Sequence, residues 1–176
     1  MKKFFLFIWE VIKIVVIALI IVIPIRMFVF QPFSVRGASM EPNYYNLDYL
    51  IVEEISYRFQ EPQRGDVIVF YSPEDNSLRL IKRIIGLPGE SIKVSAGKVW
   101  IKQENENYKI FDEIEYLPED VKTLGSVEYS LEENQYFVLG DNRRVSHDSR
   151  GFGILPRENI IGKTIFKLWS TEYFND

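Results

Sequence analysis

The chain has 176 residues, of which 47% are apolar and 15% aromatic, and it carries a formal net charge of −4. This composition allows one sizeable core and excludes an intrinsically disordered protein, and the acidic balance gives no reason to expect nucleic acid as a partner. With no cysteine and a single histidine, His147, the sequence offers neither a disulfide framework nor a zinc site built from thiolates or several histidines. We therefore expect no metal and no cofactor.

The first segment, from Phe4 to Phe30, is almost wholly apolar and is interrupted only by Glu10, Lys13 and Arg26. Its longest uninterrupted run is shorter than the roughly 20 residues that span a bilayer. However, Glu10 and Lys13 are three residues apart and can pair on one helix face, and the basic side chains can reach the membrane interfaces. Residues 1–31 are therefore predicted to form a cytoplasmic stub and a transmembrane anchor in contact with membrane lipid.

Two other interpretations of this segment are a cleaved secretory signal and a buried core helix. A secretory signal ends in small residues at its cleavage site, whereas residues 24–30 are bulky. A core helix of a globular domain is not apolar on all sides. Lys2 and Lys3 precede the apolar run, so the positive-inside rule predicts a cytoplasmic N-terminus and an extracytoplasmic domain over residues 32–176, although Arg26 argues weakly for the reverse.

Beyond the anchor, short apolar runs alternate with turn signals, which is typical of β structure. The Ala96-Gly97 pair between two such runs predicts a hairpin. The fold class that follows is mainly β, with a partly open, barrel-like domain. The predicted strands lie at residues 47–55, 66–71, 78–85, 91–94, 98–102, 136–139 and 160–169.

One stretch departs from the strand pattern. Glu104 to Glu133 contains ten acidic residues against Lys109 and Lys122. We interpret residues 103–135 as an insertion or small subdomain with a solvated acidic face, because runs of charge usually face water; a functional acidic site is the alternative.

Three places could carry chemistry, and the first is the run Gly37-Ala38-Ser39-Met40-Glu41-Pro42. A serine among small residues can present its hydroxyl to a ligand, and Gly37 allows another backbone to approach closely. Alone, the same pattern fits an ordinary loop serine.

The second place is Lys82, which alternation along a strand puts on one face with Leu80 and Ile84. Lysine is seldom fully buried, so Lys82 is either an edge residue whose amine reaches solvent or a desolvated amine. Desolvation disfavours the charged form and lowers the pKa of a lysine, which would make it a usable base near neutral pH.

The third place is the polar run from Gly140 to Gly153, where two acids and three arginines indicate a fixed network of ion pairs. Ser146 in this run could hydrogen-bond an amine. A triad of Ser39, His147 and Asp148 is a further alternative, but neighbouring residues on an extended chain point to opposite faces, so Asp148 is poorly placed to orient His147.

In this order after an N-terminal anchor, these segments resemble the type I signal peptidases of bacteria, over nearly the whole chain. Any one motif could arise by chance, but four in order form a specific signal. The four are Ser39-Met40-x-Pro42; Arg64 to Phe70; Lys82 to Glu90; and Gly140-Asp141-Asn142-Arg143 followed by Ser146, Asp148, Ser149, Arg150, Phe152 and Gly153.

The resemblance implies a serine endopeptidase with a Ser–Lys dyad, which removes signal peptides from translocated preproteins at the outer face of the membrane. It implies that Ser39 attacks the scissile carbonyl through its hydroxyl and donates its backbone N–H to the oxyanion, while Lys82 takes and returns the proton. The supporting residues that it implies are Ser146, which orients the lysine amine, and Asp141, Asp148 and Arg150, which hold the loop.

Some members of that family carry a serine two residues before the nucleophile as a second oxyanion donor, and this chain has Gly37 there. A lost donor can cost about 2.7–4 kcal/mol, so a backbone or water donor should compensate. The single anchor, the short length and Gly37 look more like members from Gram-positive bacteria. Lys82 argues against the eukaryotic reticulum-type branch, which uses histidine at that place.

The family prefers small residues at the first and third positions before the cut. By resemblance, the residues that line those shallow pockets are Phe33, Val35, Met40 and Ile81, and alternation puts Phe33 and Val35 on one face. Two other functions remain open. One is a self-cleaving repressor, but an anchor stands where its DNA-binding domain would be. The other is a non-catalytic, membrane-tethered homologue that assists surface-protein or pilus assembly, which the presence of both Ser39 and Lys82 disfavours.

Overall fold

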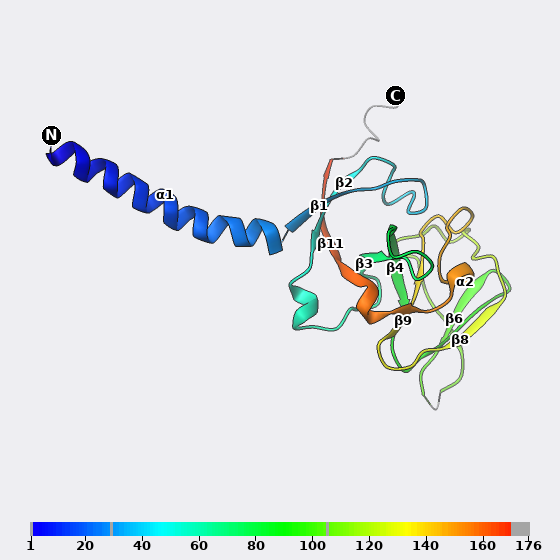
Figure 1. Cartoon of the computed structure of the whole chain (residues 1–176). Coiled ribbons are helices and arrows are strands. Elements are labelled where there is room, and N and C mark those ends of the chain that lie inside the picture. The colour runs from blue at the N-terminus through cyan, green and yellow to red at the C-terminus, as the bar shows by residue number, and fades with distance from the viewer. Residues whose placement is uncertain (1, 29, 105, 170–176) are drawn as a thin grey trace, which may run out of the picture.

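The computed structural model describes residues 2–28, 30–104 and 106–169. One long helix, α1 (Lys2–Phe28), extends away from a β domain (Figure 1). Its stretch Lys3–Val22 has the length and composition needed to cross a membrane, and none of it is buried against the rest of the chain. The predicted pair on this helix is present, since Lys13 Nζ lies 2.7 Å from Glu10 Oε1.

The larger sheet has seven strands in the order β1-β2-β11-β3-β4-β9-β10, and neighbouring strands are antiparallel. Its strands are β1 (Phe30–Ser34), β2 (Tyr49–Glu53), β3 (Val67–Tyr71), β4 (Arg79–Gly86), β9 (Gln135–Leu139), β10 (Leu155–Pro156) and β11 (Ile160–Trp169).

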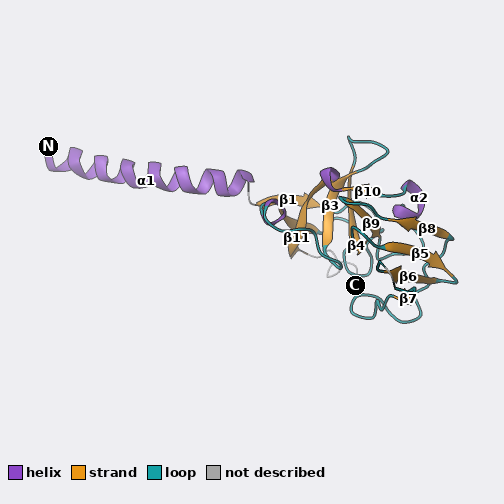
Figure 2. Ribbon diagram, turned by 90° about the horizontal axis from the view of Figure 1, so that it is seen from below, coloured by secondary structure: helices purple, strands orange, loops and turns teal. Residues whose placement is uncertain are grey.

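A smaller antiparallel sheet, of order β7-β6-β5-β8, lies on the other side of the β domain from α1 (Figure 2). Its strands are β5 (Ser91–Ser95), β6 (Lys98–Lys102), β7 (Lys109–Ile110) and β8 (Val127–Ser130). The predicted hairpin is confirmed: β5 and β6 pair directly, and Ala96 and Gly97 make the turn with φ of 52° and 76°. Positive φ at both central residues matches the right-handed twist of the flanking strands.

The fold class is therefore mainly β, as predicted, and each predicted strand corresponds to an observed one. Sequence patterns did not predict the strands β1, β7, β8 and β10. The remaining elements are short: α2 (Ser149–Phe152) and the 3-10 turns η1 (Ser56–Arg58) and η2 (Arg157–Asn159).

The core explains why the sequence of β3 is apolar almost throughout. Successive residues of β3 alternate between two hydrophobic clusters, with Ile68 and Phe70 in one and Val67 and Val69 in the other. Because both faces of β3 are covered, no face of this strand is left for polar residues. A third cluster joins the end of β4 to the smaller sheet, and Ile85 belongs to it.

The strand pairing of β11 with β2 depends on a glycine. A side-chain carbon added at Gly162 would overlap the backbone oxygen of Glu53 on β2. We therefore expect Gly162→Ala to lower the free energy of unfolding by about 1–3 kcal/mol, as overpacked interiors generally do. Chemical denaturation of the detergent-solubilised chain measures this, with Lys163→Ala on the same strand as the control; equal stability of the two variants would contradict the prediction.

Candidate active site

Ser39 lies on the loop between β1 and β2, and Lys82 lies within β4. The fold brings these residues, 43 positions apart, into direct contact, with 2.8 Å between Lys82 Nζ and Ser39 Oγ. Lys82 Nζ also donates to the backbone oxygen of Ile81 at 2.8 Å. This separation is within the range expected for a nucleophile and its general base.

The amine of Lys82 is almost completely withdrawn from solvent, because only 3% of the residue is exposed. Its strand partner is Ile68, and Leu80 and Ile84 belong to the same cluster, as alternation predicts. This desolvation lowers the pKa of Lys82 to about 8, against an opposing effect of the carboxylates of Asp148 and Asp141. A neutral amine is therefore accessible close to physiological pH.

The loop of residues 140–150 packs directly on the Ser39 backbone. The backbone N–H of Asn142 donates to the backbone carbonyl oxygen of Ser39 at 3.0 Å. Gly140 lies between this contact and Ser146, since an added side-chain carbon there would overlap both the Ser39 oxygen and the Ser146 hydroxyl. Only glycine allows the two segments to approach this closely.

Asp141 connects this loop to β4 and to the Ser39 loop. Arg83 forms a two-pronged ion pair with it, with Nε to Oδ1 at 2.9 Å and Nη2 to Oδ2 at 2.7 Å. Asn43 Nδ2 donates to the same carboxylate at 2.8 Å. Asp141 has no exposed side-chain surface, so these bonds replace its hydration.

Asp148 and Arg150 shape the other half of the loop. The Asp148 carboxylate accepts from Arg150 Nε at 2.8 Å and from the N–H of Gly140 at 3.0 Å. Burial alone would raise the pKa of Asp148, but the Arg150 guanidinium outweighs it and the net pKa is lowered. Arg150 also donates to the backbone oxygens of Arg143 and Ser146.

The predicted supporting residue Ser146 lies beside Gly140. Its hydroxyl oxygen is buried and makes no hydrogen bond of normal geometry within the described chain. The amine of Lys82 is bonded to Ser39 and Ile81 rather than to Ser146. The structure therefore brings Ser146 to the site without the expected bond to the lysine.

The alternative triad is not assembled. His147 is exposed, and its Nε2 lies 2.7 Å from Glu74 Oε2, on the β3–β4 turn. The carboxylate of Asp148 is occupied by Arg150 and Gly140 instead.

A groove of about 420 Å³ leads to the dyad, and Phe33 and Ile81 are on its walls. The other two predicted lining residues, Val35 and Met40, lie in the core, 1% and 0% exposed. Gly37 is on the exposed approach to Ser39, with φ of 87°, and its N–H donates to Asn46 Oδ1 at 2.9 Å.

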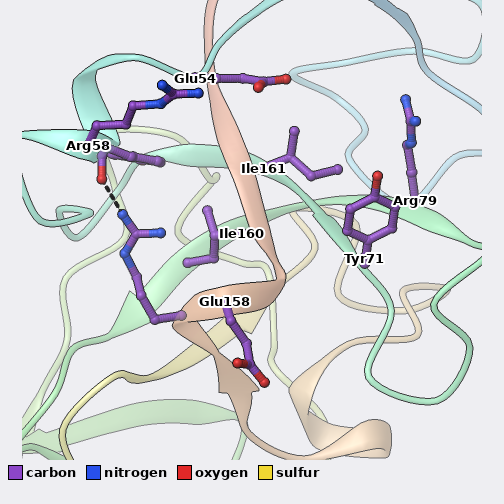
Figure 3. Close-up of a pocket in the computed structure, with 9 residues that line it drawn as sticks. Glu54, Arg58, Tyr71, Arg79, Glu158, Ile160 and Ile161 are labelled. Atoms are coloured by element: carbon purple, nitrogen blue, oxygen red, sulfur yellow. Dashed lines mark hydrogen bonds between the residues drawn. The ribbon is translucent and has the colours of Figure 1, made fainter.

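Another hollow, of about 390 Å³, lies beyond the groove wall and is shown in Figure 3. Its side chains include Arg58, Arg79, Tyr71, Glu54 and Glu158. Neither Ser39 nor Lys82 lines it, so it is not part of the dyad site. Among the residues described, no cluster of His, Cys, Asp or Glu is arranged to hold a metal ion.

The sequence patterns did not identify Arg83 as a site residue. Arg83 follows Lys82 on a strand, so alternation places its side chain on the opposite face of the sheet from that of Lys82. The patterns also missed two residues of the acidic segment. Glu113 forms an ion pair with the buried Arg143, at 2.5 and 2.8 Å, and the ring of Tyr116 lies under the Arg83 guanidinium at 4.1 Å. No local pattern distinguishes Glu113 from the other nine acidic residues of the segment.

Removal of the Asp141 carboxylate should unfold the site. Asp141→Ala leaves the guanidinium of Arg83 buried and unpaired, and we expect a loss of about 3–5 kcal/mol in stability. The comparison variant is Glu128→Ala, which breaks the exposed pair with Lys93 and should change the unfolding midpoint little. Denaturant titration measures the unfolding midpoint of both variants. Similar midpoints would show that the Asp141 carboxylate is not needed for stability.

Comparisons with known proteins identify the family. The family model described as "Signal peptidase, peptidase S26" matches residues 8–169. Signal peptidase I of Leptolyngbya laminosa is 38% identical over 170 residues, which are 91% of this chain and 79% of that protein. Signal peptidase I P of Bacillus subtilis subsp. natto is 35% identical over 161 residues, covering 86% and 83% of the two chains. A solved signal peptidase I from Enterococcus faecalis V583 is 31% identical, with a TM-score of 0.46, and covers 59% of this chain and 97% of that one. The chain thus belongs to the signal peptidases of peptidase family S26.

Proposed function

We propose that this chain is a membrane-bound serine endopeptidase that removes N-terminal signal peptides from exported preproteins. The cut follows small residues in an Ala-x-Ala type of site, with Ser39 as nucleophile and Lys82 as general base. The observation that carries the proposal is the 2.8 Å contact between the Ser39 hydroxyl and a lysine amine that is 3% exposed.

In the first chemical step the neutral amine of Lys82 takes the hydroxyl proton as Ser39 Oγ attacks the scissile carbonyl. The resulting ammonium then donates that proton to the leaving amine, so the C–N bond breaks and an acyl-enzyme remains. A water molecule, deprotonated by the same amine, releases the acyl group and restores Ser39. The buried Ser146 hydroxyl, which has no hydrogen-bond partner within the described chain, is proposed to orient the lysine amine as it changes charge.

The developing oxyanion needs hydrogen-bond donors aimed at it. The backbone N–H of Ser39 makes no hydrogen bond within the described chain, which leaves it available for this role. Gly37 contributes no side-chain donor. Its N–H is engaged by Asn46, so the second donor comes from another group or from water.

The groove suits an extended peptide. β1 is the edge strand of the larger sheet, and in the described chain residues 79–82 of β4 pair only with β3. Both flanks of the groove therefore present open backbone edges to which a strand can add. Val35 and Met40, packed in the core next to Phe33 and Ile81, limit the depth of the groove and favour small side chains.

We also propose that residues 1–31 form the anchor, with the N-terminus in the cytoplasm, and that residues 32–176 form the extracytoplasmic catalytic domain. The exposed apolar surface of α1 supports a lipid environment, and Lys2 and Lys3 support the orientation. The dyad then works on preproteins as they emerge from the membrane.

Cleavage of a preprotein with an Ala-x-Ala site by the full chain in detergent and lipid tests the dyad. Ser39→Ala and Lys82→Met should each reduce kcat by at least about a thousandfold, because the nucleophile and its base act as one unit. The matched controls are Ser130→Ala and Lys98→Met, both at exposed positions of the smaller sheet, which should cleave normally. Normal cleavage by either dyad variant would rule out the assignment.

The pH dependence of the reaction follows from the lowered pKa of Lys82. Only the neutral amine can act as base, so kcat/KM should rise with pH and level off above about 8. Below that value the rate should fall about tenfold per pH unit, and roughly a tenth of the enzyme is active at pH 7. A pH–rate profile measures this, and a midpoint near the ordinary lysine value of 10.5 would contradict a desolvated base.

A further inference from the structure

A hollow of about 810 Å³ lies between the 140–150 loop and the acidic segment, and the steps proposed above do not use it. We call it the exit hollow. Six of the residues that line it are Pro42, Leu117, Val121, Leu124, Asn142 and Arg144.

The exit hollow lies beside the loop that carries Ser39, although Ser39 itself does not line it. Two of its lining residues are close to Ser39. Pro42 is three residues beyond Ser39, and the N–H of Asn142 donates to the backbone oxygen of Ser39 at 3.0 Å. Among the described residues, the exit hollow shares no lining residue with the groove that contains Phe33 and Ile81. Ser39 lines the groove and Pro42, on the same loop, lines the exit hollow, so a peptide that ran from the groove past Ser39 along this loop would reach the exit hollow.

One wall of the exit hollow, residues 117–124 of the acidic segment, is attached to the catalytic loop. Arg150 Nη1 donates to the backbone oxygen of Leu124 at 3.0 Å. Arg143 Nη1 donates to the buried Thr123 hydroxyl. On the other side, Asn43 Nδ2 donates to the backbone oxygen of Tyr116 at 2.9 Å. The wall is thus held in place before a ligand arrives, which reduces the entropic cost of binding.

The exit hollow combines an apolar surface with balanced charge. Leu117 is buried beneath it, whereas Val121 and Leu124 are 36% and 61% exposed. Charged residues of both signs also line it: Glu41, Asp120, Lys122 and Arg144. Exposed apolar side chains in a preformed concave site favour an apolar ligand group. The equal numbers of acidic and basic side chains give no preference for a charged ligand group.

We propose that the exit hollow binds the first few residues after the scissile bond, the start of the mature protein, and prefers an apolar side chain there. This assignment rests on the proposed function, which places the residues before the cut in the groove. It gives residues 117–124 of the acidic segment a role in substrate selection through the leaving half of the preprotein.

The test uses the full-length protein in detergent and lipid with peptides that share one signal half and one Ala-x-Ala site. The first peptide continues with three leucines, the second with three serines, and the third ends in a small chromogenic amine. The wild type should favour the leucine peptide over the serine peptide by about tenfold in kcat/KM, a usual range for apolar pockets. Leu124→Lys should bring that ratio close to one, while the backbone contact of residue 124 with Arg150 is retained.

The matched control is Ile110→Lys on β7, an equally apolar residue that is 50% exposed outside the exit hollow; it should keep the wild-type ratio. The assignment is wrong if Leu124→Lys keeps the ratio, or if it slows the leucine and chromogenic peptides by the same factor. It is also wrong if Leu124→Lys leaves the ratio unchanged and light scattering shows that this variant changes the oligomeric state. That result would identify the exit hollow as a contact between two copies of the chain. If the wild type cleaves none of the three peptides, the proposed function itself fails, and the assignment fails with it.

Discussion

The buried carboxylate of Asp141 is the point on which the active site depends. It holds Arg83, the residue after Lys82 on β4, and it holds Asn43, four residues after Ser39. The next residue along the chain, Asn142, donates to the backbone of Ser39. One side chain thus fixes the relative positions of the strand that carries Lys82 and the loop that carries Ser39. A difference of 1 Å between these segments would take the two reacting groups out of hydrogen-bond range.

The same ion pairs also influence the charge on Lys82. Desolvation lowers the pKa of Lys82, and the carboxylates of Asp141 and Asp148 act against that effect. Each carboxylate is paired with its own guanidinium, Arg83 or Arg150, at 2.7–2.9 Å. Because a paired charge has a weaker field than a lone one, the arginines limit how far the carboxylates can stabilise an ammonium at Lys82. The network therefore has an electrostatic role in addition to holding the loop.

Sequence patterns were enough to predict seven of the strands, the β5–β6 hairpin and the contact of Ser39 with Lys82, because each depends on local alternation, turn chemistry or an ordered set of motifs. They failed where no motif marks the partner. The pairing of Glu113 with Arg143 joins residues 30 positions apart, and no periodicity in an acidic run indicates which carboxylate turns inward. Likewise, alternation placed Phe33 and Val35 on one face, but it could not show that Val35 lies in the core while Phe33 reaches the groove wall.

The connection between α1 and β1 relates the anchor to the chemistry. α1 ends at Phe28 and β1, which is one flank of the groove, begins at Phe30. Ser39 is eleven positions after Phe28, so even a fully extended chain would place Ser39 within roughly 40 Å of the end of the helix. Since β1 is paired with β2, the groove cannot move away from that end without breaking the sheet. If α1 lies in a bilayer, the nucleophile is held near the membrane surface, and a substrate that also emerges from the membrane needs only a short extended segment to reach it.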